Sequence, residues 1–245
     1  MLARTLGLAA LLIYAGSWGC AIPSGSYARP VQAVEKGTNL IGGGLMVPFA
    51  SAGAATSSFE GDASDASFAA FGEGVFFGPG FSYDRAFADG STWGIGASVF
   101  STELGTEAFT GVSATLVFLN PRFEFALGKD KPNRNLSFVV DGNLGFWTGE
   151  SGGSNIFVPI VNPSVGLRYY AKTGYGGVIL SQNVGTAFVT LAFPGSVAYD
   201  LPIGDKLHIF PEFRWDPTFF AVSLGSTVTG VSAFFSGGLA FMVEL

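Results

Sequence analysis

The chain has 245 residues, with 12 Lys and Arg against 18 Asp and Glu, which gives a formal net charge of -6. Only 12% of its residues are charged, about half the ~25% that is usual for a soluble domain. The negative charge argues against a nucleic-acid-binding protein. A single cysteine and a single histidine exclude an intramolecular disulfide and a Cys/His metal cluster. A chain this apolar must either bury an unusually large core or expose apolar side chains to lipid.

The first twenty residues have the pattern of a secretion signal. Arg4 precedes an apolar stretch at residues 6–15, and the small-residue segment 16–20 follows and ends in Cys20. The apolar stretch fits the ~7–15 residues of a signal peptide and is shorter than the ~20 of a membrane-spanning helix. Segment 16–20 resembles the lipobox of bacterial lipoproteins, in which signal peptidase II cleaves before a cysteine that then carries diacylglycerol.

This resemblance implies a signal peptide at residues 1–19 and a lipid on Cys20. Residues 20–36 are then an N-terminal periplasmic tether, and residues 37–245 form a separate domain. The alternative is ordinary signal-peptide cleavage close by, which would remove Cys20 or leave it as a free thiol.

The composition of the domain favours strands over helices. No stretch after Cys20 approaches the ~18 uninterrupted apolar residues that indicate a membrane-spanning helix. The chain contains 36 glycines, and glycine costs about 1 kcal/mol at each position inside a helix. In lipid every backbone polar group must be paired within the protein, so the remaining solution is a closed β-barrel.

Hydrophobic periodicity supports the barrel. Apolar and polar residues alternate through residues 187–202 and 229–245. In residues 206–215 the apolar set contains Phe213 and Trp215, and the alternate set contains Arg214. Alternation of this length exceeds the ~5–6 residues of a typical soluble strand and suits a tilted membrane strand of ~9–11 residues.

Alternation and turn signals together predict ten strands. They span residues 37–48, 67–87, 91–101, 110–127, 136–148, 155–172, 176–183, 186–203, 206–222 and 229–245. An even number places both chain ends on the periplasmic side. Eight or twelve strands stay open, because the seventh predicted strand is short. The predicted outer loops are 49–66, 102–109, 149–154, 184–185 and 223–228, and the first is the candidate mobile loop.

Prolines mark a weak internal repeat. Pro79, Pro121 and Pro163 are 42 residues apart and open similar phrases, and Pro194 opens a looser fourth copy. Because proline donates no ladder hydrogen bond, bulges or bends are expected at these points. Chance spacing is the alternative.

Glu73 lies on the face assigned to lipid, so its strand either begins above the membrane or contains a bulge.

These features resemble the bacterial outer-membrane β-barrel superfamily, and within it the small, functionally uncharacterised barrels with a lipoprotein-type signal peptide. The last strand is similar to the C-terminal signal that the barrel-assembly machinery reads, and the matching residues are Gly238, Phe241, Val243 and Leu245. The resemblance implies an all-β, closed antiparallel transmembrane barrel in the outer membrane. Its partners would be outer-membrane lipid and, during biogenesis, the barrel-assembly machinery.

The inward face is predicted to carry a belt of charge near the middle of the membrane. Charged side chains facing lipid there would cost ~2–4 kcal/mol each for Arg or Lys, so they should face the lumen. Since unpaired charges in a dry lumen are also costly, pairing across the lumen is expected. The belt comprises Asp84, Arg122, Glu124, Asp141, Arg168, Glu212 and Arg214. It is either the polar core of a closed barrel or the selectivity ring of a narrow pore.

Enzymatic functions are poorly served by the available residues. His208 lies three residues from a periplasmic turn, on the inward face. Barrel proteases of the omptin type need their Asp-His and Asp pairs at the outer rim, and barrel phospholipases need a Ser-His pair toward the lipid. The sequence therefore predicts a barrel without catalytic residues, metal or cofactor.

Two functions remain open. The first is a structural or surface-interaction barrel with a largely occluded lumen. The strand number favours it, because side chains fill the interior of an eight-strand barrel and ten strands enclose only slightly more space. The second is a narrow passive channel for small or apolar solutes. Five phenylalanines can point inward, namely Phe76, Phe100, Phe118, Phe210 and Phe234.

Overall fold

The computed structural model describes residues 28–30, 34–59, 62–71, 78–104, 112–127, 136–151, 154–187, 190–223 and 227–245. No helix in these ranges is long and apolar enough to cross a membrane. The strand segments are β1 (Asn39–Phe59), β2 (Asp62–Phe71), β3 (Gly78–Ala88), β4 (Ser91–Leu104), β5 (Val112–Leu127), β6 (Leu136–Ser151), β7 (Ser154–Lys172), β8 (Gly177–Ala187), β9 (Thr190–Ala192), β10 (Gly195–Ile203), β11 (Leu207–Ser223) and β12 (Thr227–Glu244).

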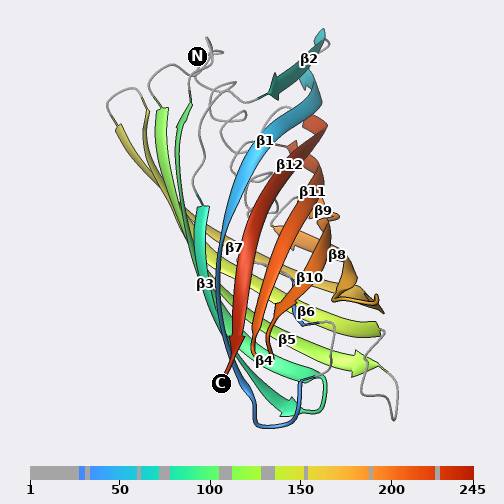
Figure 1. The fold of residues 1–245 in the computed structure, drawn as a ribbon. Helices are drawn as coiled ribbons and strands as arrows, with labels where there is room; N and C mark the ends of the chain where they lie inside the picture. The colour runs from blue at the N-terminus through green and yellow to red at the C-terminus, as the bar shows by residue number, and fades with distance from the viewer. Residues whose placement is uncertain are drawn as a thin grey trace.

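The strands close into a barrel in which every pairing is antiparallel (Figure 1). β12 pairs with β1, and β10 bridges β8 and β11, so the ring is complete. β2 and β3 pair with successive parts of β1, and β9 and β10 both lie between β8 and β11. The segments thus occupy ten positions around the ring. The prediction of a closed antiparallel ten-strand barrel is confirmed.

The predicted loop at residues 49–66 is wrong. β1 continues to Phe59 and β2 begins at Asp62, and the two pair from Ala50 with Phe71 to Phe59 with Asp62. The segment is rich in Ser, Ala and Gly and shows no apolar alternation, so its sequence resembles a loop. Backbone pairing does not need apolar side chains, and the far edge of β1 also pairs with β12.

Pairing is interrupted at two of the four prolines, Pro121 and Pro194, whereas Pro79 pairs with Leu45 without a register shift. Pro79 lies at the start of β3, and Pro194 lies in the break between β9 and β10. At Pro121 the ladder between β5 and β6 is interrupted, while Pro163 pairs with Gly142 without a register shift. A bulge at Pro163 is therefore not observed.

The start of β1 and the end of β12 meet at the side of the barrel that has the short turns. Leu245 N donates a hydrogen bond to Asn39 O (2.8 Å), which joins the end of β12 to the start of β1. Gly90 and Gly204 in the turns at this end have φ of 71° and 66°, the left-handed region that glycine adopts without a steric penalty. We refer to this as the short-turn end.

The wall alternates between exposed apolar and buried polar side chains. Exposed residues include Phe81, Phe123 and Leu239, whereas Ser82 and Arg122 beside them in sequence are buried. Aromatic rings also pack together on the outer face, as in the stacked Phe123 and Phe125. The outside of this barrel is apolar, and many of its buried side chains are polar or charged, unlike those of a soluble barrel.

Candidate functional site

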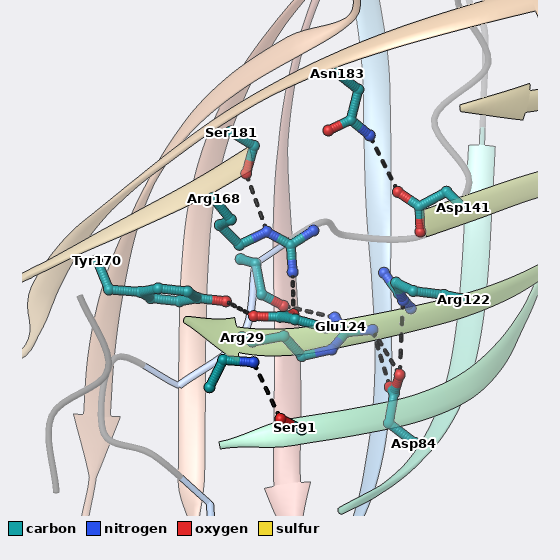
Figure 2. Close-up of polar contacts among 12 residues, drawn as sticks. Arg29, Asp84, Ser91, Arg122, Glu124, Asp141, Arg168, Tyr170, Ser181 and Asn183 are labelled. Carbon is teal, nitrogen blue, oxygen red and sulfur yellow. Dashed lines mark hydrogen bonds and ion pairs between the residues drawn. The ribbon is translucent and has the colours of Figure 1, made fainter. Parts of the chain in front are cut away.

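The seven residues predicted to form the belt all point into the barrel. Each is at most 5% exposed, and they come from β3, β5, β6, β7 and β11. Their contacts differ from the predicted pairing across the lumen. Most of the observed contacts run along the wall and skip one strand, as Figure 2 shows.

Asp84 and Arg122 meet across β4. The two residues and Gly94 occupy one row, because Gly94 pairs with Asp84 on one side and with Arg122 on the other. Arg122 Nε lies 3.6 Å from Asp84 Oδ1. A Cβ on Gly94 would lie 2.0 Å from the same oxygen, so only glycine leaves room for the Asp84 side chain to lie over β4.

Arg168 and Glu124 meet across β6. Arg168 Nη1 lies 2.5 Å from Glu124 Oε2, and Arg168 Nε donates to Ser181 Oγ (3.1 Å). Tyr170 donates its hydroxyl to the other Glu124 oxygen (2.6 Å). Both oxygens of this buried carboxylate are thus engaged, which is the condition for a buried ion pair to be tolerated.

Asp141 completes the same group of charges. It lies directly opposite Arg122 in the ladder between β5 and β6, and it accepts a hydrogen bond from Asn183 Nδ2 (3.1 Å). The Asn183 side chain reaches Asp141 over β7, where a Cβ on Gly166 would lie 2.0 Å from Asn183 Oδ1. Glycines on the intervening strand, Gly94 in β4 and Gly166 in β7, therefore leave room for the Asp84 and Asn183 side chains.

Glu212 and Arg214 pair within a single strand. Both lie on β11, and Arg214 Nε donates to Glu212 Oε1 (3.0 Å). Asp216, the next inward residue of β11, is also buried. The third arginine of the predicted belt thus contacts an acid of its own strand.

Arg29 is a member of this group that the sequence analysis missed. Its Nη2 lies 2.9 Å from both oxygens of Asp84, and both side chains are fully buried. Burial, and then the nearby positive charge of Arg122, lower the pKa of Arg29 to about 10, so it remains protonated at neutral pH. We call Arg29, Asp84, Arg122, Glu124, Asp141 and Arg168 the charge cluster.

The sequence does contain a signal for Arg29. The predicted belt holds three arginines and four acids, an imbalance that a buried site would have to compensate. Residues 28–30 belong to the stretch assigned to a periplasmic tether, yet they lie inside the barrel. The cation that balances the cluster therefore comes from outside the ten strands.

An apolar layer fills the lumen at the short-turn end. Its buried residues are Ala28, Val34, Leu40, Ala86, Tyr170, Ile179, Ala198, Phe210, Ala240 and Met242. Two of them, Ala28 and Val34, are not on strands. An eight-strand barrel is just filled by its own side chains, so a ten-strand interior has space for this additional chain.

Backbone hydrogen bonds fasten the same stretch to the turn between β3 and β4. Gly90 N donates to Val34 O (2.8 Å), Gly37 N donates to Ala86 O (2.8 Å), and Ala86 N donates to Thr38 O (2.9 Å). We call residues 28–30 and 34–38 the N-terminal segment. It runs from the short-turn end into the lumen as far as Asp84.

His208 has acidic partners on both neighbouring strands. Its Nδ1 lies 2.7 Å from Asp200 Oδ1, and its Nε2 lies 3.6 Å from Glu244 Oε1. It also stacks on Phe210. This arrangement joins β10, β11 and β12 at the short-turn end. Among the described residues no group of three or more His, Cys, Asp and Glu side chains is placed to hold a metal.

The remaining predicted residues divide between described and undescribed positions. Phe118 and Phe210 are buried, whereas Phe76, Glu73 and Cys20 lie outside the described residues, as do the side chains of Phe100 and Phe234. At the C-terminus Phe241 and Leu245 are exposed on the outer face, and Val243 is half-buried. Gly238 packs against Met46, whose sulfur would lie 2.2 Å from an added Cβ.

Comparisons with known proteins give similar folds only. No protein-family model matches the chain, and no curated protein sequence matches it. The translocator domain of the autotransporter NalP from Neisseria meningitidis is 11% identical, with 100% of this chain and 97% of that chain covered and a TM-score of 0.42. The outer membrane protein OprG from Pseudomonas aeruginosa is 10% identical, with 88% and 99% covered and a TM-score of 0.39. A mutant of the monoaromatic hydrocarbon channel TodX is 8% identical, with 86% and 91% covered and a TM-score of 0.37.

Proposed function

We propose that this protein is an integral outer-membrane barrel with a largely occluded lumen and a structural or surface-interaction role. The observation that carries the proposal is the charge cluster, in which three arginines and three acids are each less than 5% exposed. The apolar layer below it includes the N-terminal segment. A continuous water-filled pore would leave such side chains exposed.

The outer wall supports the membrane location. Phe81, Phe123 and Leu239 expose about half of their surface, and a contiguous apolar surface of this kind indicates a lipid or protein contact. In this proposal the short-turn end faces the periplasm, as in bacterial barrels with short periplasmic turns. The barrel-assembly machinery would recognise Gly238, Phe241, Val243 and Leu245, of which Phe241 and Leu245 are exposed.

Bilayer recording tests the occluded lumen. We expect the refolded wild-type protein to insert into planar lipid bilayers without steady unitary conductance, because the charge cluster and the N-terminal segment fill the lumen. Insertion is monitored in parallel by protease protection of the barrel in vesicles of the same lipid. Steady, reproducible unitary currents would contradict the proposal.

A narrow passive channel for small or apolar solutes is the second candidate. The observation that favours it is a set of inward polar side chains on several strands. Asn120 Oδ1, Asn183 Oδ1, Ser98 Oγ and Ser236 Oγ are buried and have no hydrogen-bond partner among the described residues. Buried polar atoms of this kind are commonly satisfied by water. Unitary currents in the bilayer experiment would favour this channel.

Lipidation of Cys20 is part of the proposal. We expect wild-type protein to incorporate radiolabelled palmitate in cells and Cys20→Ala protein to incorporate none. The variant should still assemble, because the barrel strands lie elsewhere in the chain, and its gel mobility should still change on heating. Unlabelled wild-type protein would instead indicate ordinary signal-peptide cleavage.

A further inference from the structure

Arg29 lies against a buried part of the barrel wall whose side chains carry an excess of negative charge. Of the six charged groups in the charge cluster, five belong to strands: the acids Asp84, Glu124 and Asp141, and the cations Arg122 and Arg168. The wall alone therefore carries one excess negative charge in a buried region. Arg29 brings the sixth charge from the N-terminal segment and balances it.

Asp84 is the wall carboxylate that Arg29 contacts. Its carboxylate is fully buried, and Arg29 Nη2 donates a hydrogen bond to Asp84 Oδ1 (2.9 Å) and lies 2.9 Å from Asp84 Oδ2. The wall cation Arg122 lies farther away, at 3.6 Å, and also faces Asp141. Without Arg29, the wall would retain a carboxylate that is desolvated but only partly compensated, a costly arrangement.

The surroundings favour a guanidinium group over other cations. Arg29 Nη1 donates to the neighbouring Ala28 O (2.6 Å), so the guanidinium uses more than one nitrogen. The side chains of Arg29 and Asp84 are both fully buried, so a cation must lose its water to pair with Asp84. A guanidinium is more weakly hydrated than an ammonium, so it enters such a dry site at lower cost.

We propose that the lumen wall around Asp84 is a guanidinium-binding site, which Arg29 occupies in the folded protein and which binds guanidinium from solution when Arg29 is removed. The site rests on the proposed occluded lumen, since it lies within the buried charge cluster. Its ligand class is a small planar cation that carries a guanidinium group.

Chemical rescue of Arg29→Ala tests the site. We expect the variant to unfold at lower temperature than the wild type in detergent. Guanidinium chloride at millimolar concentration should restore the midpoint in a saturable manner, while NaCl and methylammonium chloride at equal ionic strength should not. A ligand at about ten times its Kd multiplies the folding equilibrium constant about elevenfold.

The double variant Arg29→Ala/Asp84→Asn is the matched control. It lacks both charges, so guanidinium should have no saturable effect on it. If Arg29→Ala alone does not fold, its refolded yield with and without guanidinium becomes the readout, and the same rescue is expected. A wild-type-like Arg29→Ala midpoint, or a response that NaCl reproduces, would overturn the proposal.

Failure of the site and failure of the occluded lumen can be distinguished. Steady conductance of the wild-type protein would overturn occlusion but would leave the rescue experiment unchanged. A silent wild-type protein with no guanidinium rescue of Arg29→Ala would keep occlusion and remove the binding site.

Discussion

Replacing Arg168 with alanine should destabilise the barrel by ~3–5 kcal/mol, the cost of leaving a buried acid without its cation. Arg168 lies 2.5 Å from Glu124, and both side chains are almost fully buried. The change leaves Glu124 with the hydroxyl of Tyr170 as a neutral partner. The measurement is the urea midpoint of unfolding in detergent or lipid, with Arg85→Ala as a control because Arg85 is exposed.

A second substitution should recover part of this loss. Glu124, and not Asp141, is the acid that Arg168 contacts most closely. We therefore expect Glu124→Gln to restore part of the stability of Arg168→Ala, and Asp141→Asn to restore less. A double-mutant cycle measures this coupling.

The opposite result would identify a wet pore. Exposed ion pairs contribute only about 0–1 kcal/mol, so Arg168→Ala in a hydrated lumen would cost little. A stable Arg168→Ala protein with altered conductance would therefore overturn the occluded barrel. A destabilised and electrically silent variant would agree with it.

Replacing Gly94 with alanine should also destabilise the protein, by about 1–3 kcal/mol for overpacking alone. A Cβ there would lie 2.0 Å from Asp84 Oδ1 and 2.6 Å from the backbone oxygen of Tyr83. Because one of these atoms is backbone, the conflict cannot be relieved by a side-chain rotation alone. The displaced Asp84 would also lose contact with Arg29 and Arg122.

Gly96→Ala is a matched control on the same strand and the same face. The nearest atom to a Cβ on Gly96 is Phe81 O at 3.4 Å, an ordinary contact. Its urea midpoint should therefore equal or slightly exceed that of the wild type, because alanine reduces the freedom of the unfolded chain. Equal effects of Gly94→Ala and Gly96→Ala would show that the room left for Asp84 does not matter.

The strand prediction stops where the apolar alternation stops. β4 continues to Leu104 and β8 to Ala187, past the predicted ends at residues 101 and 183. Alternation of apolar and polar residues requires an apolar environment on one face of the strand. Ladder hydrogen bonds, in contrast, continue wherever a neighbouring strand continues. Strand ends and the hairpin of β1 and β2 were therefore outside the reach of periodicity.

The candidate site was partly accessible from the sequence. Where one face of a strand is apolar and faces outward, the charged residues that alternate with it must point inward. The burial of Asp84, Arg122 and Arg168 therefore followed from their positions in the alternating pattern. Their partners did not, because a contact such as Arg168 with Glu124 depends on the register of β5, β6 and β7 and on the curvature that brings alternate strands together. The contact of His208 with Asp200 depends on the register of the neighbouring strands β10 and β11, which the sequence pattern does not give.

What the sequence determined by itself was the all-β class and the inward or outward direction of residues in the strands with apolar alternation, because a period of two and the need to pair every backbone group leave little choice in lipid. What only the tertiary structure decided was the content of the lumen. The placement of Arg29 beside Asp84 joins residues 55 positions apart. No local pattern records such a contact, since it arises only when ten strands enclose a space that their own side chains do not fill.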